Sequence, residues 1–468
     1  MSSVFVNPKV NISALNRFLS HFKAQEYELH TLQIFDHDTP MVRIGIDPYA
    51  PSDKREVFSL SKSFCSTAIG ILVTNGLLSV EDRIIDIFPD QCPEVISENL
   101  AAMRVRHVLS MNTGHSQCVM PNMLFTDNPV KAFLAQEVPF APGTHFAYNS
   151  GATCLLSCMV TKLTGLNLVD FLTKHLFLPL GIEEISWDTT HSGVNTGGVG
   201  CCVSSDDIIK LGQLYLHGGV YNGKRILSEE WVKLATSPIS EGIPNGPIDW
   251  CSGYGFQFWL NSREGFRGAG YAGQMCFVLP ERGIIAAMQT FLGNMQLEVD
   301  LLMELICDLY GESDTETVIL PDYPAFSSTE KTVSFDNTVW KFDKNPGGYT
   351  IIRLKYHAED DAMHLILSNG REQYVIKSGN GKWMENTIYA AAFKPKLTDL
   401  QTGDTPERCR FTTSYKIEKD KIVMCLRFLD GPHSGTLSLS VQDGVLHFDI
   451  DPEQQLHDGA AHLTAHLL

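Results

Sequence analysis

The hydrophobic pattern of this chain changes character near residue 310. Before that point, several segments carry apolar side chains every three or four residues, which is typical of helices with one buried face. After it, short segments such as AMHLILS (362–368) and KIVMCLRFL (421–429) alternate apolar and polar residues between turn residues, which indicates strands. Because the two patterns predict different architectures, we expect two domains.

The boundary between these domains is predicted from a polar segment. Residues 311–331, GESDTETVILPDYPAFSSTEK, are aperiodic and contain prolines, which is typical of a linker. A chain of 468 residues also exceeds the length at which a single hydrophobic core usually stops growing. We therefore assign residues 1–311 to the first domain, 312–331 to the linker and 332–468 to the second domain.

The first domain is predicted to be α+β, or mixed α/β, with helices around one antiparallel sheet. Apolar spacing and turn residues predict a hairpin at 30–46 and further strands at 254–260, 274–279 and 283–290. Helices are expected at 10–24, from Ser59 to Asn75, and at 104–112, 152–163, 167–176, 205–217, 228–236 and 295–310. For the second domain we expect an antiparallel β structure, for which a lipocalin-like barrel is one arrangement.

Charge and cysteine content argue against several classes of partner. The formal net charge of -18 makes the average surface repel phosphate backbones and anionic lipids, so we expect no nucleic-acid and no membrane partner. The N-terminal segment MSSVFVNPKVNISALNRF lacks the basic start and apolar run of a secretory signal, which predicts a cytoplasmic protein. The 12 cysteines are scattered without Cys-x-x-Cys spacing, so we expect reduced thiols and no metal site.

The first candidate for chemistry is a Ser-x-x-Lys pair, Ser59 and Lys62, in EVFSLSKSF (56–64). On one helix this spacing places the amine over the same face as the hydroxyl, where a neutral amine can accept the hydroxyl proton. Partial burial and a helix N-terminus both lower the pKa of a lysine. The pattern therefore predicts Ser59 as a nucleophile and Lys62 as its base. The alternative is a helix cap with a solvated lysine.

The same spacing occurs at two other places, Ser20 with Lys23 and Ser328 with Lys331. The first pair falls on an amphipathic surface helix, and the second falls in the predicted linker. Neither opens a long apolar helix after a strand-like segment, as Ser59 does. We interpret both as accidental matches.

The wider sequence resembles the class C β-lactamase-related serine hydrolases, a family that includes penicillin-binding enzymes, carboxylesterases, D-aminopeptidases and nylon-oligomer hydrolases. The resemblance covers residues 10–310. Besides EVFSLSKSF it rests on TNGLLSVEDRIIDIFPD, MRVRHVLSMNTGH, PGTHFAYNSGA, NTGGVGCCVSSDDIIKLGQLYLHGGVYNGKRILSEEW and GYGFQFW, in the family's order. It implies a β-lactamase/transpeptidase-like first domain and an acyl-enzyme formed on Ser59.

The resemblance assigns the family's second element to Tyr148, in PGTHFAYNSG. In the family this hydroxyl meets the serine and the lysine and shuttles protons to the leaving group. The usual pattern is Tyr-x-Asn, whereas here Ser150 stands two residues after the tyrosine, so a hydroxyl replaces the amide. This departure weakens a β-lactamase assignment more than a general hydrolase assignment. The alternative is a buried structural tyrosine.

The family's third element is Lys-Thr-Gly or His-Thr-Gly on a strand beside the serine, and this chain contains no Lys-Thr-Gly. Its expected counterpart is FRGAGYAGQ (266–274). Glycines such as Gly270 would let a substrate lie against the strand, and a backbone N–H near Tyr271 would join that of Ser59 as an oxyanion hole. Arg267 would stand near the usual cationic position. The alternative is a glycine-rich turn with a surface arginine.

Together these features predict a serine hydrolase for a small ester or amide, which needs no cofactor. A β-lactamase, a D-aminopeptidase and an acyltransferase of the same family are close alternatives. A catalytically lapsed binding protein is an alternative of another class. The sequence leaves the acyl group, the leaving group and the oligomeric state open.

Overall fold

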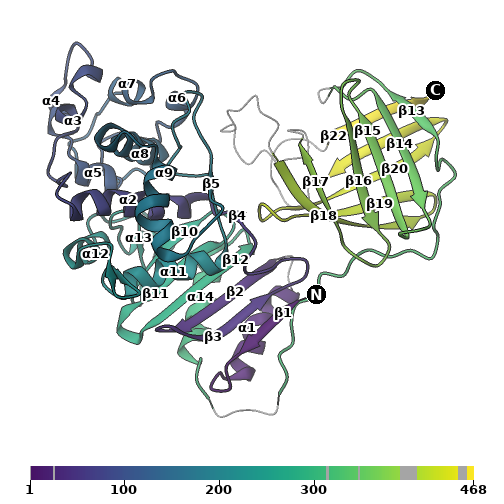
Figure 1. Ribbon diagram of the computed structural model, residues 1–468, viewed down its shortest axis with the longest axis horizontal. Coiled ribbons are helices and arrows are strands. Elements are labelled where there is room, and N and C mark those ends of the chain that lie inside the picture. Colours follow the sequence, from purple (N-terminus) through teal and green to yellow (C-terminus); the bar gives the residue numbers. More distant parts are fainter. Residues whose placement is uncertain (1, 25–26, 312–315, 346–347, 390–407, 452–460) are drawn as a thin grey trace. The chain divides into compact units, whose positions relative to one another are not determined.

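The computed structural model describes residues 2–24, 27–311, 316–345, 348–389, 408–451 and 461–468 (Figure 1). Packing divides the chain into two compact units, Ser2–Pro321 and Asp322–Leu468. The division falls inside the segment that the sequence marks as a linker, of which residues 312–315 lie outside the described part. Each unit has its own sheet and its own core.

The first unit contains a seven-stranded sheet among its described residues, in the order β1-β3-β2-β12-β11-β10-β9 (Figure 1). Each neighbouring pair in it is antiparallel. Its strands are β1 Ser3–Val6, β2 Glu28–Asp36, β3 Thr39–Gly45, β9 Trp259–Leu260, β10 Phe266–Gly270, β11 Gln274–Leu279 and β12 Ile284–Phe291. Two smaller sheets join β4 Arg55–Glu56, β6 Cys201–Val203 and β5 Ser186–Trp187, and β7 Val220–Tyr221 with β8 Lys224–Arg225.

The helices of this unit account for the rest of its regular structure. They are α1 Ile12–Ala24, α2 Ser61–Thr74, α3 Ile84–Ile87, α4 Glu98–Ala102, α5 Val105–Leu109, α6 Pro121–Leu124, α7 Pro129–Leu134, α8 Ser150–Thr164, α9 Leu168–Leu172, α10 Leu178–Leu180, α11 Ser205–Leu216, α12 Glu229–Ala235, α13 Ile248–Cys251 and α14 Met295–Cys307. Short turns of other helix types occur at η1 Phe58–Leu60, η2 Pro89–Gln91, η3 Thr173–Phe177 and η4 Pro280–Arg282. The predicted α+β class and β-lactamase/transpeptidase-like architecture are confirmed.

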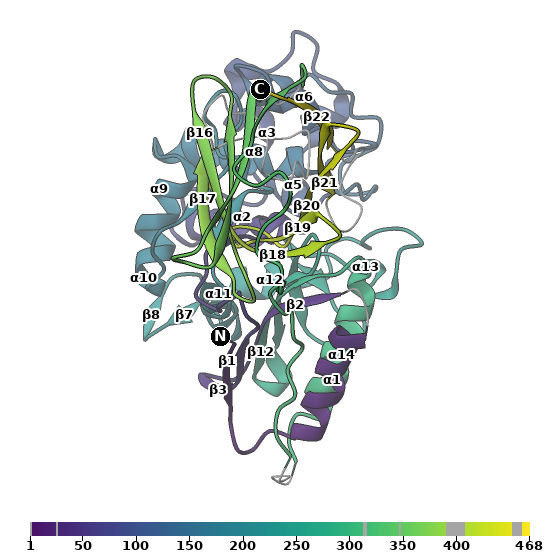
Figure 2. The same ribbon diagram turned by 90° about the vertical axis from the view of Figure 1, so that its right-hand side faces the viewer.

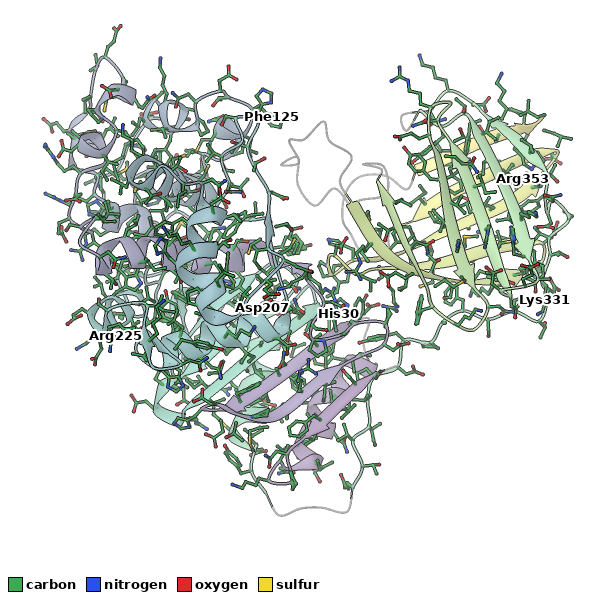
Figure 3. The ribbon with its side chains drawn as sticks, in the orientation of Figure 1. His30, Phe125, Asp207, Arg225, Lys331 and Arg353 are labelled. Carbon is green, nitrogen blue, oxygen red and sulfur yellow. The ribbon has the colours of Figure 1, made fainter. Side chains whose placement is uncertain are left out.

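Local capping explains where several helices begin. At α11 the side chains of Ser204 and Asp207 cap each other's backbone N–H groups, and Asp207, labelled in Figure 3, also pairs with Lys54 at 2.6 Å. Asn294 accepts a hydrogen bond from Leu297 N at the start of α14. Helices α1 and α14 lie side by side (Figure 2).

Helix α2 is buried on nearly every side, since all its residues from Ser61 to Leu72 are buried. A helix without a solvated face belongs to the interior of a domain. Its close packing depends on Gly70, where a Cβ would lie 2.3 Å from Nε1 of Trp231 on α12. Helix α2 is therefore enclosed by the domain from Ser61 to Leu72.

The strand predicted over residues 254–260 is wrong for most of its length. Only Trp259–Leu260 form a strand, because Gly253 and Gln257 take positive φ angles of 124° and 64° and turn the chain. Gln257 is buried and donates from Nε2 to the Leu109 carbonyl at 2.7 Å. This loop therefore lines the core beside α8, where Thr153 Oγ1 donates to Gln257 Oε1 at 2.8 Å.

The second unit is an antiparallel β domain, as predicted. Its strands are β13 Val339–Phe342, β14 Ile351–His357, β15 Ala362–Ser368, β16 Gln373–Gly379, β17 Met384–Tyr389, β18 Arg408–Glu418, β19 Lys421–Phe428, β20 Ser434–Gln442, β21 Val445–Asp451 and β22 Ala461–Leu467. Within the described part, β13–β16 and β18–β22 close into a ring through one parallel pairing, Gly379 with Ser414. Inward-facing apolar side chains such as Ile352, Leu365 and Phe448 fill it.

No single described helix has the length and apolar composition needed to cross a membrane. One bent pair, Ser150–Thr164 with Leu168–Leu180, meets those two criteria jointly with a bend of 71°.

Replacing Gly70 by alanine should destabilise the first unit, because the new methyl group would collide with the rigid Trp231 ring. Overpacking of this kind costs about 1–3 kcal/mol. Gly293→Ala is a matched control, since a Cβ there has no described atom within 4 Å, and it should change stability by less than about 0.5 kcal/mol. Urea denaturation of both variants measures the difference, and equal stabilities would contradict this packing.

Candidate active site

Ser59 lies in η1, the tight turn that runs directly into α2. The sequence placed it in the first turn of the helix itself, and the structure places it just before. Its neighbour Phe58 is buried and has φ 46°, a conformation that costs a non-glycine residue about 1–3 kcal/mol. Ser59 is half-buried, so its hydroxyl stands at a strained junction that leaves it partly accessible.

Lys62 follows one turn later and is 1% exposed. Its Nζ lies 3.1 Å from Ser59 Oγ, 3.1 Å from Ser150 Oγ and 2.8 Å from the carbonyl oxygen of Gly198. Burial lowers the pKa of this amine to about 7, against smaller raising effects of Cys118 and Cys65. The lysine is therefore partly neutral at neutral pH.

The three partners determine how a neutral Lys62 can use its hydrogens. A neutral amine has two N–H groups and one lone pair. The Gly198 carbonyl can only accept, and the Ser150 hydroxyl can also accept. Donation to these two groups leaves the lone pair for the third neighbour, Ser59. The arrangement can therefore take the hydroxyl proton of Ser59.

The ring of Tyr148 packs against the same amine, and its centroid lies 4.8 Å from Lys62 Nζ. The side chain of Ser59 lies close enough to the phenol to act on its pKa. Its ring stacks on Trp259, with centroids 5.5 Å apart and an interplanar angle of 20°. Burial raises the pKa of Tyr148 above its ordinary value, although the side chain of Ser59 opposes this. The phenol therefore keeps its proton at neutral pH and can donate it.

The Tyr-Asn-Ser sequence divides two tasks between its last two residues. Asn149 accepts hydrogen bonds through Oδ1 from the N–H groups of Gly151 and Ala152, at 2.9 and 3.3 Å, and so begins α8. Ser150 is the first residue of that helix, and its hydroxyl reaches Lys62. The hydroxyl that replaces the usual amide thus still contacts the lysine.

Strand β10 approaches the serine closely because it carries glycines. A Cβ on Gly268 would lie 2.3 Å from Leu60 Cδ1, and one on Gly270 would lie 2.1 Å from the carbonyl oxygen of Val57. The next residue, Tyr271, is 44% exposed, and its ring packs edge-on against Phe58 at 5.7 Å. The backbone of β10 therefore packs against the turn that carries Ser59, at Val57 and Leu60.

Arg267 does not join this group. Its side chain is 0% exposed, with NH2 2.6 Å from the Asp249 carbonyl oxygen and NH1 2.8 Å from Asn261 Oδ1. The guanidinium also stacks over the Trp250 ring, 4.3 Å from its centroid. Because these contacts occupy the group inside the protein, we correct the expectation that Arg267 is a surface arginine or a cationic anchor for substrate.

Two members of the cluster were missed by sequence reasoning. Gly198 contributes a main-chain carbonyl, which a motif of side chains does not predict. The segment NTGGVG that contains it was part of the family resemblance. Cys118 lies near enough to interact electrostatically with both Lys62 and Tyr148. The competing serines stand elsewhere: Ser20 donates to the Arg17 carbonyl at 2.6 Å, and Lys331 pairs with Asp361 at 2.9 Å.

A group of metal-ligating side chains occurs in the second unit, where ligand atoms of His357, Asp360 and His364 lie within 4.8 Å of one another. Lys355 and Lys377 flank His364 in the register of β14, β15 and β16, on the same face. Two ammonium groups beside the imidazoles oppose a divalent cation. We therefore assign no metal to this group.

The family model described as Beta-lactamase matches residues 33–294, a span that contains the whole Ser59 cluster. The chain belongs to the beta-lactamase family. A 6-aminohexanoate-dimer hydrolase from Paenarthrobacter ureafaciens is 23% identical over 262 residues, which cover 50% of this chain and 64% of that protein. A D-aminopeptidase from Brucella ovis is 25% identical over 187 residues, which cover 34% of this chain and 35% of that protein.

The beta-lactamase family fold is also seen in a penicillin-binding protein homologue from Caulobacter crescentus. Its structure superposes with a TM-score of 0.52 at 15% identity and covers 66% of this chain and 100% of that one. The likeness shows a shared fold over 66% of this chain.

The lowered pKa of Lys62 should make stability depend on pH. Because the folded-state pKa of about 7 lies below the ordinary value of 10.5, the unfolded state binds more protons between these values, and stability rises with pH there. Lys62→Met removes this dependence. We expect the stability of the natural chain to rise relative to the variant by up to about 1.4 kcal/mol per pH unit above about pH 7.

Urea denaturation at several pH values measures this difference. Lys162→Met, at an exposed position of α8, is the matched control and should run parallel to the natural chain. Parallel curves for Lys62→Met as well would show that its amine is charged in the folded protein.

Proposed function

We propose that this protein is a serine hydrolase that acts on a small ester or amide through an acyl-enzyme on Ser59. The observation that carries the proposal is the 3.1 Å contact between the Ser59 hydroxyl and the buried Lys62 amine, whose pKa lies near 7. A base with a pKa near the working pH is the most effective general base. The proposal assigns the chemistry to the first unit, and the second unit contributes no nucleophile.

In the acylation step, Ser59 Oγ attacks the substrate carbonyl carbon while its proton passes to Lys62 Nζ. The π electrons of the carbonyl move to its oxygen, and the backbone N–H groups of Ser59 and Tyr271 would bind the resulting oxyanion. The glycine-rich backbone of β10 supports this assignment, because Gly270 approaches the carbonyl of Val57 and the Tyr271 ring packs against Phe58, the residue before Ser59. Main-chain donors held rigidly in this way contribute strongly to stabilising a tetrahedral intermediate.

Collapse of the intermediate breaks the bond to the leaving group and requires a proton. Tyr148 is suited to donate it, because burial keeps its phenol protonated and the phenol lies near the side chain of Ser59. The Lys62 ammonium formed in the first half can return a proton to the phenolate. A water molecule then attacks the acyl-enzyme by the same route and releases the acid, whereas an alcohol or amine in place of water would make the enzyme an acyltransferase.

The relatives support hydrolysis. Two proteins similar to this chain are named as a 6-aminohexanoate-dimer hydrolase and a D-aminopeptidase. The matched segments cover 64% and 35% of those proteins, so these names suggest a reaction class for the first unit.

Ser59→Ala should abolish turnover of p-nitrophenyl esters and labelling by an activated phosphonate, because it removes the hydroxyl to which the proposal assigns the attack and leaves the Ser150 hydroxyl as an acceptor for Lys62. Intact-mass spectrometry detects the phosphonate adduct. Lys62→Ala and Tyr148→Phe should each lower kcat by at least about a hundredfold, the scale of a lost general base or acid. Ser20→Ala is the control and should retain full labelling. Labelling that survives in Ser59→Ala would remove Ser59 from the mechanism.

The enzyme should prefer a small ester to a β-lactam. A penicillin or cephalosporin needs a group that binds its carboxylate, and Arg267, the nearest candidate by sequence, is buried against Asp249 and Asn261. The chain also carries a formal net charge of -18, which disfavours anionic substrates. Comparing kcat/KM for p-nitrophenyl butyrate and nitrocefin tests this expectation. A higher value for nitrocefin would favour a β-lactamase, and stable acylation without turnover would favour a binding protein.

A further inference from the structure

A carboxyl group is buried beneath the turn that joins β10 and β11. Glu298 on α14 is 0% exposed, and its Oε1 lies 3.2 Å from Thr290 Oγ1 on β12. Within the described part of the chain, its other oxygen, Oε2, has no hydrogen-bond partner. The carboxyl presses against the turn itself, since a Cβ on Gly273 would lie 2.3 Å from Oε2. A buried acid in this position needs a physical explanation.

The hydrogen bonds of Thr290 supply that explanation. Its hydroxyl oxygen lies 2.8 Å from the carbonyl oxygen of Ala272, 3.2 Å from Glu298 Oε1 and 3.4 Å from the carbonyl oxygen of Gly273. A hydroxyl has one hydrogen to donate. The shortest contact, to the Ala272 carbonyl, is the natural acceptor for it. The contact between Thr290 and Glu298 then requires a hydrogen from the glutamic acid.

The Ala272 carbonyl depends on this donor. Its other donors are more distant, with Leu292 N at 3.3 Å and Gln274 Nε2 at 3.5 Å. Ala272 has φ 56° and follows Tyr271 directly, so it lies in the most constrained part of the turn. A conformation that is unfavourable for alanine persists only where surrounding contacts hold it. Of the hydrogen bonds to the Ala272 carbonyl, the one from the Thr290 hydroxyl is the shortest.

The charged group that acts on Glu298 favours its ionised form, whereas burial favours the protonated acid. Arg267 on β10 is the cation that acts on it, and Asp249 on α13 acts in turn on Arg267. The guanidinium donates hydrogen bonds to the carbonyl oxygen of Asp249 and to Oδ1 of Asn261. Burial outweighs both the attraction of Arg267 and the hydrogen bond that Thr290 could donate to an ionised carboxylate, and it raises the pKa of Glu298 to about 8. The group is therefore largely protonated at neutral pH.

We propose that Glu298 is a positioning residue that, as the neutral acid, donates to Thr290 and through it fixes the Gly270–Gln274 turn beside Ser59. This inference rests on the proposed function, because that turn carries the Tyr271 N–H assigned to the oxyanion. When Glu298 ionises, its carboxylate competes for the single Thr290 hydrogen and draws it away from the Ala272 carbonyl. The turn then loses its closest hydrogen bond, and the rate of acylation falls as the pH rises.

The pH profile of acylation tests this role. The rate of Ser59 phosphonylation, followed by intact mass, should rise as Lys62 loses its proton near pH 7 and decline above about pH 8 as Glu298 ionises. Glu298→Gln replaces the O–H donor with a non-titrating N–H donor, so its profile should lack the alkaline decline. Glu304→Gln, at an exposed position of the same helix, is the matched control and should keep that decline.

Variants of Thr290 test the same relay without altering the carboxyl group. Thr290→Val removes the hydroxyl and should slow phosphonylation by about three- to tenfold, the effect of one lost hydrogen bond. Thr290→Ser retains the hydroxyl and should restore the rate. An alkaline decline that persists in Glu298→Gln, or a Thr290→Val enzyme as fast as Thr290→Ser, would overturn the proposal.

A measurement independent of activity separates this inference from the function on which it rests. At pH 7 the infrared spectrum of the Ser59→Ala protein should contain the C=O band of a protonated carboxylic acid, and the Ser59→Ala, Glu298→Gln double variant should lack it. Absence of a band that depends on Glu298 would overturn the neutral acid even if Ser59 is the nucleophile. A band without any Ser59 labelling in the natural chain would leave the neutral acid standing and reject the hydrolase.

Discussion

The contact between the amine of Lys62 and the hydroxyl of Ser59 is the interaction on which the rest of the site depends. It works as a base and nucleophile pair only if the amine is neutral, and burial supplies that condition by penalising the charged form. The burial in turn comes from α2, whose residues from Ser61 to Leu72 are all enclosed. The same lysine on a solvated helix would stay protonated and could not accept the proton.

A helix cap and a closely packed glycine hold the neighbours of this pair in place, although neither takes part in the proposed reaction. Asn149 caps α8 and thereby presents Ser150 to the lysine. Gly197 has φ 69° and packs so closely on the Thr153 carbonyl that a Cβ would lie 2.7 Å from it, which brings the next carbonyl, that of Gly198, onto Lys62. Each contact fixes one hydrogen of the amine, so the direction of its lone pair follows from packing.

Burial shifts the pKa values of Lys62 and Glu298 in opposite directions. It lowers the pKa of Lys62 to about 7 and raises that of Glu298 to about 8, because in each case it disfavours the charged form. In the proposed mechanism the lysine acts as the base, and the glutamic acid acts as a hydrogen-bond donor. Burial in one apolar interior can therefore favour both a proton acceptor beside Ser59 and a neutral acid beneath the turn that joins β10 and β11.

The sequence alone predicted the fold class of both units and the adjacency of Ser59 and Lys62, because helical and strand periodicity and a spacing of three residues are local properties. Tertiary structure decided what lies far apart along the chain. Ser150 and Gly198 meet Lys62 across 88 and 136 residues. Arg267 became a buried structural cation because Asp249 and Asn261 fold around it. Hydrophobic periodicity does not predict such long-range contacts, since they depend on which surfaces pack together once the chain is compact.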